Sequence, residues 1–375
     1  MSSARRLATL SAVIRPLAVC VGTPPDVVRL APVVHELRRR ALPVTVVSAA
    51  REPATLKPTL ATFGIDADLE VPGAAGAGAL AGALERVRPA AVLVQGDAVP
   101  AVHGAHAAGA RGLPVAHVAS GRRPLDAADV LGAELRRRQI ADVARWLFLP
   151  GQTPLAGLLR AGVDPTGIAV TGATTADAVR WVAARRGLLD RPRTAGPRRV
   201  LVVARAGAGD TGKVGAVTAA VARLAERADV EVVLALDAPP VVRASVLPAL
   251  AVHDNVTALG ALHFEELVGM AATSHLVLTD AGGVEEVSPA LGVPLLVMGE
   301  SAARPEGVAA GCARLCGAAP AGILQHAERL LDDEALHRRM ATAPNPGGDG
   351  RAAQRIVARL AGDLAPGVHE GLLAA

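Results

Sequence analysis

Aromatic side chains are almost absent from this sequence. Its 375 residues include no Tyr, three Phe and two Trp. Proteins that hold single-stranded nucleic acid stack its bases on aromatic side chains, so the composition argues against that class of function. The hydrophobic cores must instead be built from Ala, Val and Leu, and a hydrophobic content of 51% is ample for two of them.

Lysine is equally scarce, because Lys57 and Lys213 are the only two in the chain. The net charge of +4 is therefore carried by arginines, which are scattered along predicted helices. The main run, residues 38–40, closes a predicted helix, where cations complement the helix dipole. Scattered arginines are typical of a solvated surface rather than of a basic patch that binds nucleic acid. We therefore expect no nucleic-acid partner.

The sequence also lacks paired cysteines and long apolar runs. Cys20, Cys312 and Cys316 provide neither a disulfide framework nor a paired metal motif. His103 and His106 share one face of a predicted helix, but no further ligand residues accompany them, so we expect no metal. No stretch is long and apolar enough to span a bilayer, and the apolar segment near the N-terminus is too short for a signal peptide. The sequence predicts a cytoplasmic protein without a membrane segment.

What the chain does contain is a regular alternation of short apolar runs and amphipathic stretches, which is typical of a parallel sheet built from βαβ units. The first series of predicted strands lies at 17–21, 44–48, 91–94, 115–118, 147–149 and 169–171. The second series lies at 200–203, 230–236, 256–259, 276–279 and 295–298. Predicted helices between the strands include 27–40, 80–87, 98–110, 214–228, 264–272 and 284–291.

A polar, proline-containing stretch at 191–199 separates the two series. We therefore predict an α/β fold with two Rossmann-like, doubly wound domains that face a cleft. The N-terminal domain is expected over residues 1–175, joined by a C-terminal helix over 352–375. The C-terminal domain is expected over residues 176–351.

The first predicted strand ends in a turn of the kind that binds ligands, because ligands of doubly wound folds lie at the carboxyl ends of strands. Gly22 permits a tight turn there. Pro25 presets the start of a helix whose free N–H groups can bind an anion. The turn matches neither the dinucleotide fingerprint nor the phosphate-binding loop.

The segment LVLTDAGGVEEVSPALG (276–292) is the most specific feature of the sequence. Gly282 and Gly283 let a phosphate approach the backbone where a helix begins. Glu285 and Glu286 lie in the first turn of that helix, where a carboxylate either takes ribose hydroxyls or only complements the helix dipole. Arg304 follows as a candidate clamp for a diphosphate.

Four further segments accompany these two: HVASGRR (117–123), TGATTADAV (171–179), RPEGV (304–308) and NPGGDG (345–350). In this order, the segments make the chain resemble the non-hydrolysing UDP-N-acetylglucosamine 2-epimerases over residues 17–360. The resemblance implies the GT-B arrangement of two Rossmann-like domains and the interconversion of UDP-GlcNAc and UDP-ManNAc by elimination and re-addition of UDP. It also implies a UDP-sugar substrate, a homodimer, and neither cofactor nor metal.

The resemblance assigns candidate roles to residues that this chain keeps. Asp97 matches the aspartate of the family's H-G-D-T motif and is the candidate base for the C2 proton, unless it only caps a helix. Glu134 and Arg137 match the P-E-E-x-N-R stretch and are candidate catalytic residues. Arg29 keeps the charge of a family lysine, and Arg205 lies in the segment that matches G-H-R-R-E, so both are candidates for substrate binding.

Gly22 and His117 complete the candidate set. Gly22 opens the segment that matches the family's G-T-R-P-E. His117 begins the segment that matches H-V-E-A-G, and it either orients a catalytic carboxylate or is structural. Asp129 lies near a lost glutamate and, like Glu134, is a possible substitute for it.

Several family residues are replaced. Ala119 and Ala133 stand where the family has glutamates, and Val287 stands where a glutamate binds ribose. Pro24 replaces an arginine, and Ala281 replaces a serine. Two positions that bind a second, activating nucleotide sugar in bacterial members hold Ala50 and Asp237.

These replacements leave three hypotheses open. The chain is an active 2-epimerase, a catalytically degenerate sugar-nucleotide-binding paralogue or partner subunit, or a GT-B enzyme acting on another sugar nucleotide.

Overall fold

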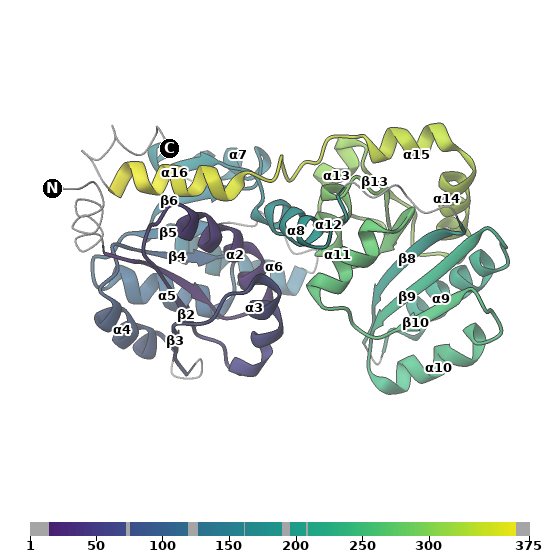
Figure 1. Cartoon of the computed structure of the whole chain (residues 1–375), viewed down its shortest axis with the longest axis horizontal. Helices are drawn as coiled ribbons and strands as arrows, with labels where there is room; N and C mark the ends of the chain where they lie inside the picture. The colour runs from purple at the N-terminus through teal and green to yellow at the C-terminus, as the bar shows by residue number, and fades with distance from the viewer. Residues whose placement is uncertain are drawn as a thin grey trace. The chain divides into compact units, whose positions relative to one another are not determined.

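The structure is a computed structural model that describes residues 15–72, 76–118, 127–160, 162–189, 196–207 and 209–364, without the side chains of 127–131. The described residues form two compact units (Figure 1). Unit 1 contains the chain up to Ala178 and again from Gly348, and unit 2 contains Val179–Gly347. In the sequence, unit 2 is therefore an insertion into unit 1.

Unit 1 is built on a seven-stranded parallel sheet with the order β3-β2-β1-β4-β5-β6-β7. Its strands are β1 (Leu17–Val21), β2 (Val44–Ser48), β3 (Leu69–Glu70), β4 (Ala91–Gln95), β5 (Val115–Val118), β6 (Ala144–Leu149) and β7 (Ile168–Val170). Its helices are α2 (Pro24–Arg39), α3 (Lys57–Phe63), α4 (Gly76–Val87), α5 (Val99–Gly109), α6 (Ala127–Ala141), α7 (Thr153–Arg160) and α16 (Ala352–Leu364), with 3-10 turns η1 (Pro53–Thr55) and η3 (Pro165–Gly167). Helix α8 (Thr174–Arg185) contains the passage to unit 2.

Unit 2 is built on a six-stranded parallel sheet with the order β10-β9-β8-β11-β12-β13. Its strands are β8 (Arg198–Arg205), β9 (Val230–Asp237), β10 (Val256–Leu259), β11 (Leu276–Thr279), β12 (Leu295–Val297) and β13 (Ala313–Leu315). Its helices are α9 (Thr211–Ala225), α10 (Pro240–Leu250), α11 (Phe264–Ala272), α12 (Val284–Ala290), α13 (Pro305–Ala310), α14 (Pro320–Asp332) and α15 (Glu334–Ala341). Both sheets extend in two directions from their first strand, which confirms the predicted fold of two Rossmann-like, doubly wound units.

The strands are apolar because helices cover both faces of each sheet. Every residue of β1 and of β4 is buried. Both cores consist mainly of Ala, Val and Leu, as the composition predicts. Three of the few aromatic side chains, Phe63, Trp146 and Phe148, are fully buried in unit 1.

The apolar runs predict the positions of most strands well. They predict the ends of helices, and the shortest strands, less well. The predicted strands 17–21, 44–48, 115–118, 256–259 and 276–279 agree with the structure. Helix α2 starts at Pro24, earlier than predicted, because proline is accepted in the first turn of a helix. Strands β3 and β13 were not predicted, since each is short and carries a charged residue, Glu70 or Arg314.

Helix α16 belongs to unit 1 and packs against α2. Its first turn is held by Asp177 of α8, whose carboxylate accepts hydrogen bonds from the backbone N–H groups of Ala352 (3.1 Å) and Ala353 (2.9 Å). Arg355 donates to the carbonyl oxygen of Thr171 at 3.0 Å. These contacts join the segment 171–179, which the sequence singled out, to α16. Arg355 also pairs with Asp349 of the segment 345–350 at 2.7 Å, so both segments have a structural role.

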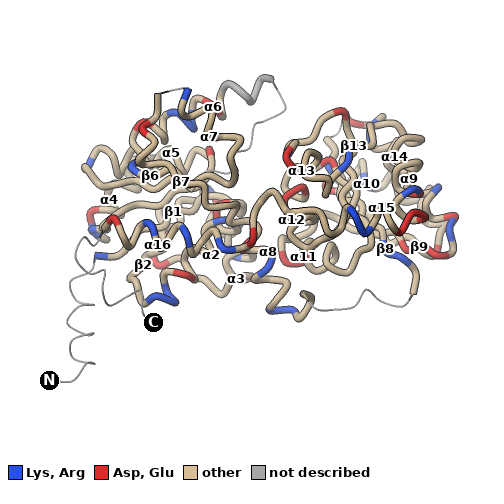
Figure 2. The backbone as a smooth tube through the Cα atoms, turned by 90° about the horizontal axis from the view of Figure 1, so that it is seen from above, with Lys and Arg blue, Asp and Glu red and all other residues tan. Residues whose placement is uncertain are grey.

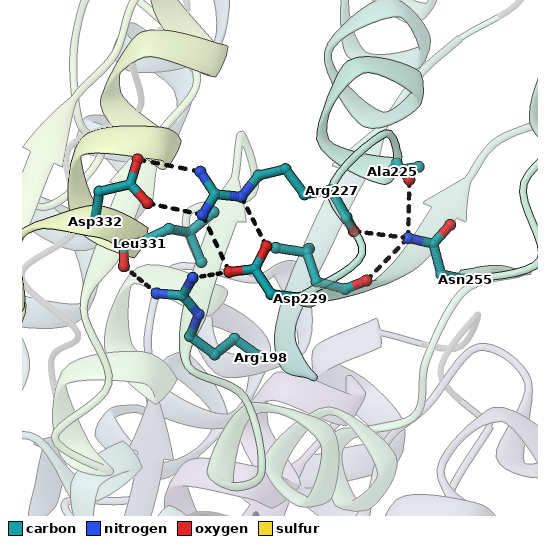
Figure 3. A network of polar contacts seen from close by, with 8 residues as sticks. Arg198, Ala225, Arg227, Asp229, Asn255, Leu331 and Asp332 are labelled. Atoms are coloured by element: carbon teal, nitrogen blue, oxygen red, sulfur yellow. Dashed lines mark hydrogen bonds and ion pairs between the residues drawn. The ribbon is translucent and has the colours of Figure 1, made fainter. Parts of the chain in front are cut away.

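A polar network lies at the amino ends of β8 and β9, the end of the sheet opposite the expected ligand edge (Figure 3). Asp229 forms ion pairs with Arg198 and with Arg227, and Arg227 also pairs with Asp332 of α14 at 2.7 Å. The Asn255 side-chain amide donates to the carbonyl oxygens of Ala225 and Val230, both at 2.9 Å. The network joins the ends of two strands and two helices without using the carboxyl edge.

The charged residues of both signs are distributed over both units (Figure 2), in line with the absence of one basic stretch in the sequence. Among the described residues, every helix is too short or too polar to cross a membrane.

Candidate functional site

The candidate residues of unit 1 lie at the carboxyl edge of its sheet. Strands β1, β4 and β5 end at Val21, Gln95 and Val118, and they are neighbours in the sheet. The residues that follow β1 and β4 are therefore close in space, although they are far apart in the sequence.

Gly22 is required where β1 meets α2. A Cβ atom on this residue would lie 2.2 Å from Cβ and 2.3 Å from Cγ of Pro100, which belongs to the first turn of α5. A proline ring in a helix turn cannot move aside, so any larger side chain displaces one of the two helix starts. The glycine that the sequence assigned to a tight turn thus also permits a close approach between α2 and α5.

Asp26 organises this turn, and sequence reasoning did not select it. Its Oδ2 accepts hydrogen bonds from the backbone N–H groups of Gly22 (3.0 Å) and Thr23 (2.8 Å). Gln95 at the end of β4 reaches the other oxygen: with its amide oriented so that Oε1 accepts from the Gly96 N–H, its nitrogen donates to Asp26 Oδ1 at 3.0 Å. The buried carboxylate therefore ties the β1–α2 turn to the end of β4.

Burial raises the pKa of Asp26 to about 6, against the opposing effect of the hydrogen bonds from Gly22 and Thr23 and of the nearby Arg29 guanidinium. Burial also lowers the pKa of Arg29, while Asp26 and Asp97 act in the opposite direction. Arg29 thus lies between two carboxylates, one buried and one at the sheet edge.

His117 fixes the loop that carries Asp97. Its ring lies in β5 and is buried, and Nε2 is 2.7 Å from the carbonyl oxygen of Gly96. Since a carbonyl only accepts, Nε2 carries the proton and donates. Burial lowers the pKa of His117 to about 4, so the ring is neutral at pH 7. Gly96 has φ +68°, a conformation that favours glycine, and the histidine holds it there.

Asp97 and two residues of α6 form the charged part of the unit 1 site. Arg137 Nη1 lies 3.2 Å from Asp97 Oδ2, and Arg137 Nη2 lies 3.2 Å from Glu134 Oε2. The Asp97 side chain is 33% exposed, and that of Glu134 is 45% exposed. Arg136 adds a hydrogen bond from Nε to the backbone oxygen of Asp97 at 2.7 Å. Two accessible carboxylates thus share one guanidinium.

The structure therefore brings together all the unit 1 candidates that the sequence selected: Gly22, Arg29, Asp97, His117, Glu134 and Arg137. Ala119 lies outside the described residues, as does the side chain of Asp129. Ala133 is buried, so the position of the lost glutamate is occupied by a small apolar side chain.

In unit 2, Asp280 joins the carboxyl ends of β8 and β11. Its Oδ1 accepts from the backbone N–H of Arg205 at 3.0 Å, and its Oδ2 pairs with Lys213 Nζ of α9 at 2.7 Å. The side chain of Arg205 is 67% exposed and its Nε is 3.4 Å from Asp237. Sequence reasoning did not select Lys213, although its rarity in this chain was a possible signal.

The two glutamates of the Gly282–Gly283 segment have different roles. Glu285 is buried, and its carboxylate accepts from the backbone N–H groups of Ala303 (3.1 Å) and Arg304 (2.7 Å), so it anchors the loop before α13. Glu286 forms an ion pair with the Arg304 guanidinium. The structure thus places two predicted nucleotide-binding groups in contact with each other.

Two doubly wound units, each with ionisable side chains and glycine turns at the carboxyl edge of its sheet, define an α/β protein of the nucleotide-binding class. The family model described as UDP-N-acetylglucosamine 2-epimerase matches residues 72–361. This chain belongs to that family.

Individual relatives agree with this assignment. The chain is 31% identical to the UDP-N-acetylglucosamine 2-epimerase of Escherichia coli strain K12, over 90% of this chain and 96% of the relative. It is 32% identical to that of Bacillus subtilis strain 168, over 90% of this chain and 93% of the relative. The solved UDP-GlcNAc 2-epimerase from Neisseria meningitidis, bound to UDP-GlcNAc, is similar with a TM-score of 0.80 and 26% identity, over 92% of this chain and 99% of that one.

Proposed function

We propose that this chain is a UDP-N-acetylglucosamine 2-epimerase that interconverts UDP-GlcNAc and UDP-ManNAc. Membership of the family supports the reaction, and the Neisseria relative bound to UDP-GlcNAc supports the substrate. The observation that carries the proposal is the Asp97–Arg137–Glu134 arrangement, which presents two part-exposed carboxylates at a ligand-binding edge despite the lost family glutamates.

The chemistry has two stages. A base removes the proton from C2 of the sugar while the C1–O bond to UDP breaks, and the bonding electrons leave with the diphosphate, giving 2-acetamidoglucal and UDP. In the return stage a UDP oxygen bonds to C1, and an acid delivers a proton to the opposite face of C2. The reaction therefore needs proton-transfer groups for two faces of the sugar.

We assign Asp97 as the C2 base and Glu134 as the second proton-transfer group. Arg137 contacts both carboxylates and orients them. His117 is a positioning residue, because its hydrogen bond to Gly96 holds the loop that carries Asp97.

We assign substrate-binding roles to residues within each unit. Arg29 and Gly22 contribute from unit 1. From unit 2 come the backbone of Gly282 and Gly283, the cations Arg205 and Arg304, and Glu286. Because Arg304 pairs with Glu286, a diphosphate that takes this arginine releases the Glu286 carboxylate for a ribose hydroxyl.

Incubation with UDP-GlcNAc in D2O tests the proposal. We expect deuterium at C2, appearance of UDP-ManNAc, and a small amount of free UDP, all followed by NMR. A protein that binds UDP but gives none of these three signals contradicts the epimerase assignment.

The second candidate is a sugar-nucleotide-binding paralogue without turnover. It is favoured by the burial of Val287 and Ala133 at positions where the family has glutamates, because buried apolar side chains there exclude a carboxylate. UDP binding without exchange in D2O identifies this alternative.

We further propose that the protein is a cytoplasmic homodimer, by analogy with the family. Light scattering coupled to size exclusion tests the dimer, and a monomer mass at micromolar concentration contradicts it. Fractionation of the source cells tests the location, and recovery of the protein outside the cytosolic fraction contradicts it.

A further inference from the structure

Unit 2 contains a cavity of about 240 Å³ between α10 and the edge of the sheet formed by β9 and β10. None of the residues assigned to nucleotide or sugar chemistry lines it. Its lining residues are apolar with one exception, and they are Leu234, Leu236, Pro240, Arg243, Ala244, Val246, Leu247, Ala258, Leu259 and Gly260.

Arg243 is the exception. Its guanidinium has neither a hydrogen bond nor an ion pair with any residue that the structure describes, and its Nε is buried without a partner. Other arginines of unit 2, such as Arg199 and Arg227, form ion pairs with carboxylates. Arg243 is only partly buried, and without a carboxylate partner among the described residues its guanidinium donors are available to a ligand that enters the cavity.

Gly260 makes room for this guanidinium. A Cβ atom on Gly260 would lie 2.6 Å from Arg243 Nη1, so the backbone at the end of β10 lies directly against the cation. The guanidinium is therefore in close contact with the backbone beside the cavity.

The surface around the cavity is apolar. Val241 is 72% exposed and Leu247 is 49% exposed, and Arg243 is the only charged residue of α10. An apolar wall with one cation is complementary to a molecule with an apolar body and one negative charge. The volume is below that of most drug-sized sites, so the ligand is small.

We propose that this cavity is a binding site for a small amphipathic carboxylate, whose carboxyl group pairs with Arg243 and whose hydrocarbon chain packs on Leu234, Leu236 and Leu247. A carboxylate matches the planar fork of a guanidinium with two parallel hydrogen bonds. The apolar chain accounts for the walls, which a bare inorganic anion leaves unfilled.

Octanoate is the probe for the test, and saturation-transfer NMR on the full chain measures its binding. Acetate supplies the charge without the chain, and octylammonium supplies the chain with the opposite charge. We expect octanoate to bind at least tenfold more tightly than either. Equal binding of octylammonium, or no binding of octanoate at millimolar concentration, overturns the proposal.

Two variants locate the site. Arg243→Met should weaken octanoate binding at least tenfold. The control Arg223→Met should leave it unchanged, because the Arg223 side chain is exposed and pairs locally with Glu226. Ala244→Phe places a larger side chain in the cavity and keeps the arginine, so it should also abolish octanoate binding. This variant tests the proposed site if Arg243→Met does not fold. If folded Ala244→Phe protein still binds octanoate, the proposed binding site is wrong. The D2O assay tests the epimerase assignment separately.

Discussion

Asp97 and Asp26 are both carboxylates within a few residues of a strand end in unit 1, yet their surroundings assign them different tasks. Asp97 is one-third exposed and contacts Arg137, so a substrate can reach it. Asp26 is buried, and its oxygens are occupied by backbone and Gln95 donors. The first can take part in proton transfer, and the second can only position other groups.

For Asp97→Asn we expect kcat to fall at least about 100-fold, because an amide cannot accept the C2 proton. Binding of UDP, measured by calorimetry, should remain within a few-fold. Asp66→Asn is the control, since Asp66 is exposed in a loop and lies outside the candidate site. An Asp97→Asn protein that keeps more than a tenth of wild-type turnover contradicts the assignment of Asp97 as base.

Asp26 makes stability depend on pH in the direction opposite to that of most carboxylates. Its pKa in the folded protein, about 6, is above the unfolded value of about 3.9, so the folded state binds the proton more tightly. The stability that this group contributes is present below pH 4 and is lost as the pH rises through 6. The expected loss is on the order of 2–3 kcal/mol.

Asp26→Asn should remove this loss, because asparagine is neutral and has nearly the same shape. Urea unfolding of both proteins from pH 4 to pH 7 measures the effect. We expect the difference between Asp26→Asn and wild type to move in favour of the variant as the pH rises. A difference that does not change with pH contradicts the raised pKa.

Several residues of the candidate site were predictable from the sequence because they follow strands directly. Gly22, Asp97 and the Gly282–Gly283 turn are of this kind. Gln95 and Lys213 were missed, because each acts through a partner that is distant in the sequence. Asp26 was missed although it lies in a matched segment, because its burial and its contact with Gln95 arise only in the fold. Local spacing does not indicate that Gln95 meets Asp26, or that Lys213 meets Asp280.

At the scale of elements, the buried inner strands were predictable, whereas two of the four edge strands, β3 and β13, were not. β1 is a continuous apolar run, and β11 is apolar up to Thr279. Such runs are typical of strands in a sheet that is covered on both faces. β3 and β13 lie at sheet edges, where a strand of two or three residues contains too few apolar positions to give a pattern.

The polar network at the amino ends of β8 and β9 leads to a prediction about the stability of the protein in acid. The hydrogen bond from Arg227, with that from Arg198, holds the pKa of Asp229 well below its usual range despite some burial. A folded-state pKa below the unfolded value stabilises the protein above about pH 4, and this contribution is lost as the pH falls through the folded value. The carboxylate is about half exposed, so solvent screening keeps the effect near 1 kcal/mol.

Asp229→Asn should therefore lower the Tm at pH 7, and the difference from wild type should shrink as the pH is lowered from 5 to 2. Differential scanning calorimetry measures both. Asp254→Asn, an exposed residue of the loop between α10 and β10, is the control and should leave the Tm unchanged. A Tm difference that persists at pH 2 argues against the charge pairing.

At the scale of the whole molecule, one carboxylate caps the helix by which the chain returns to unit 1. Asp177 binds two backbone N–H groups at the start of α16, and these groups have no other partner within the helix. Asp177→Ala should destabilise the protein by about 1–2 kcal/mol and expose α16 to proteases.

Limited proteolysis followed by mass spectrometry measures this effect. We expect cleavage to begin near α16 in Asp177→Ala and not in Asp164→Ala, whose carboxylate makes only a local contact with Thr166. Equal cleavage rates in the two variants contradict a special role for Asp177.

The insertion of unit 2 between Ala178 and Gly348 has a consequence for biosynthesis. A ribosome adds about 5–20 residues per second, so about 9–35 s separate the emergence of the last α8 residue of unit 1 from that of α16. During this interval the surface of α2 against which α16 packs is without this cover. The nascent chain is therefore open to association with chaperones or other chains at this surface of α2 until α16 has emerged.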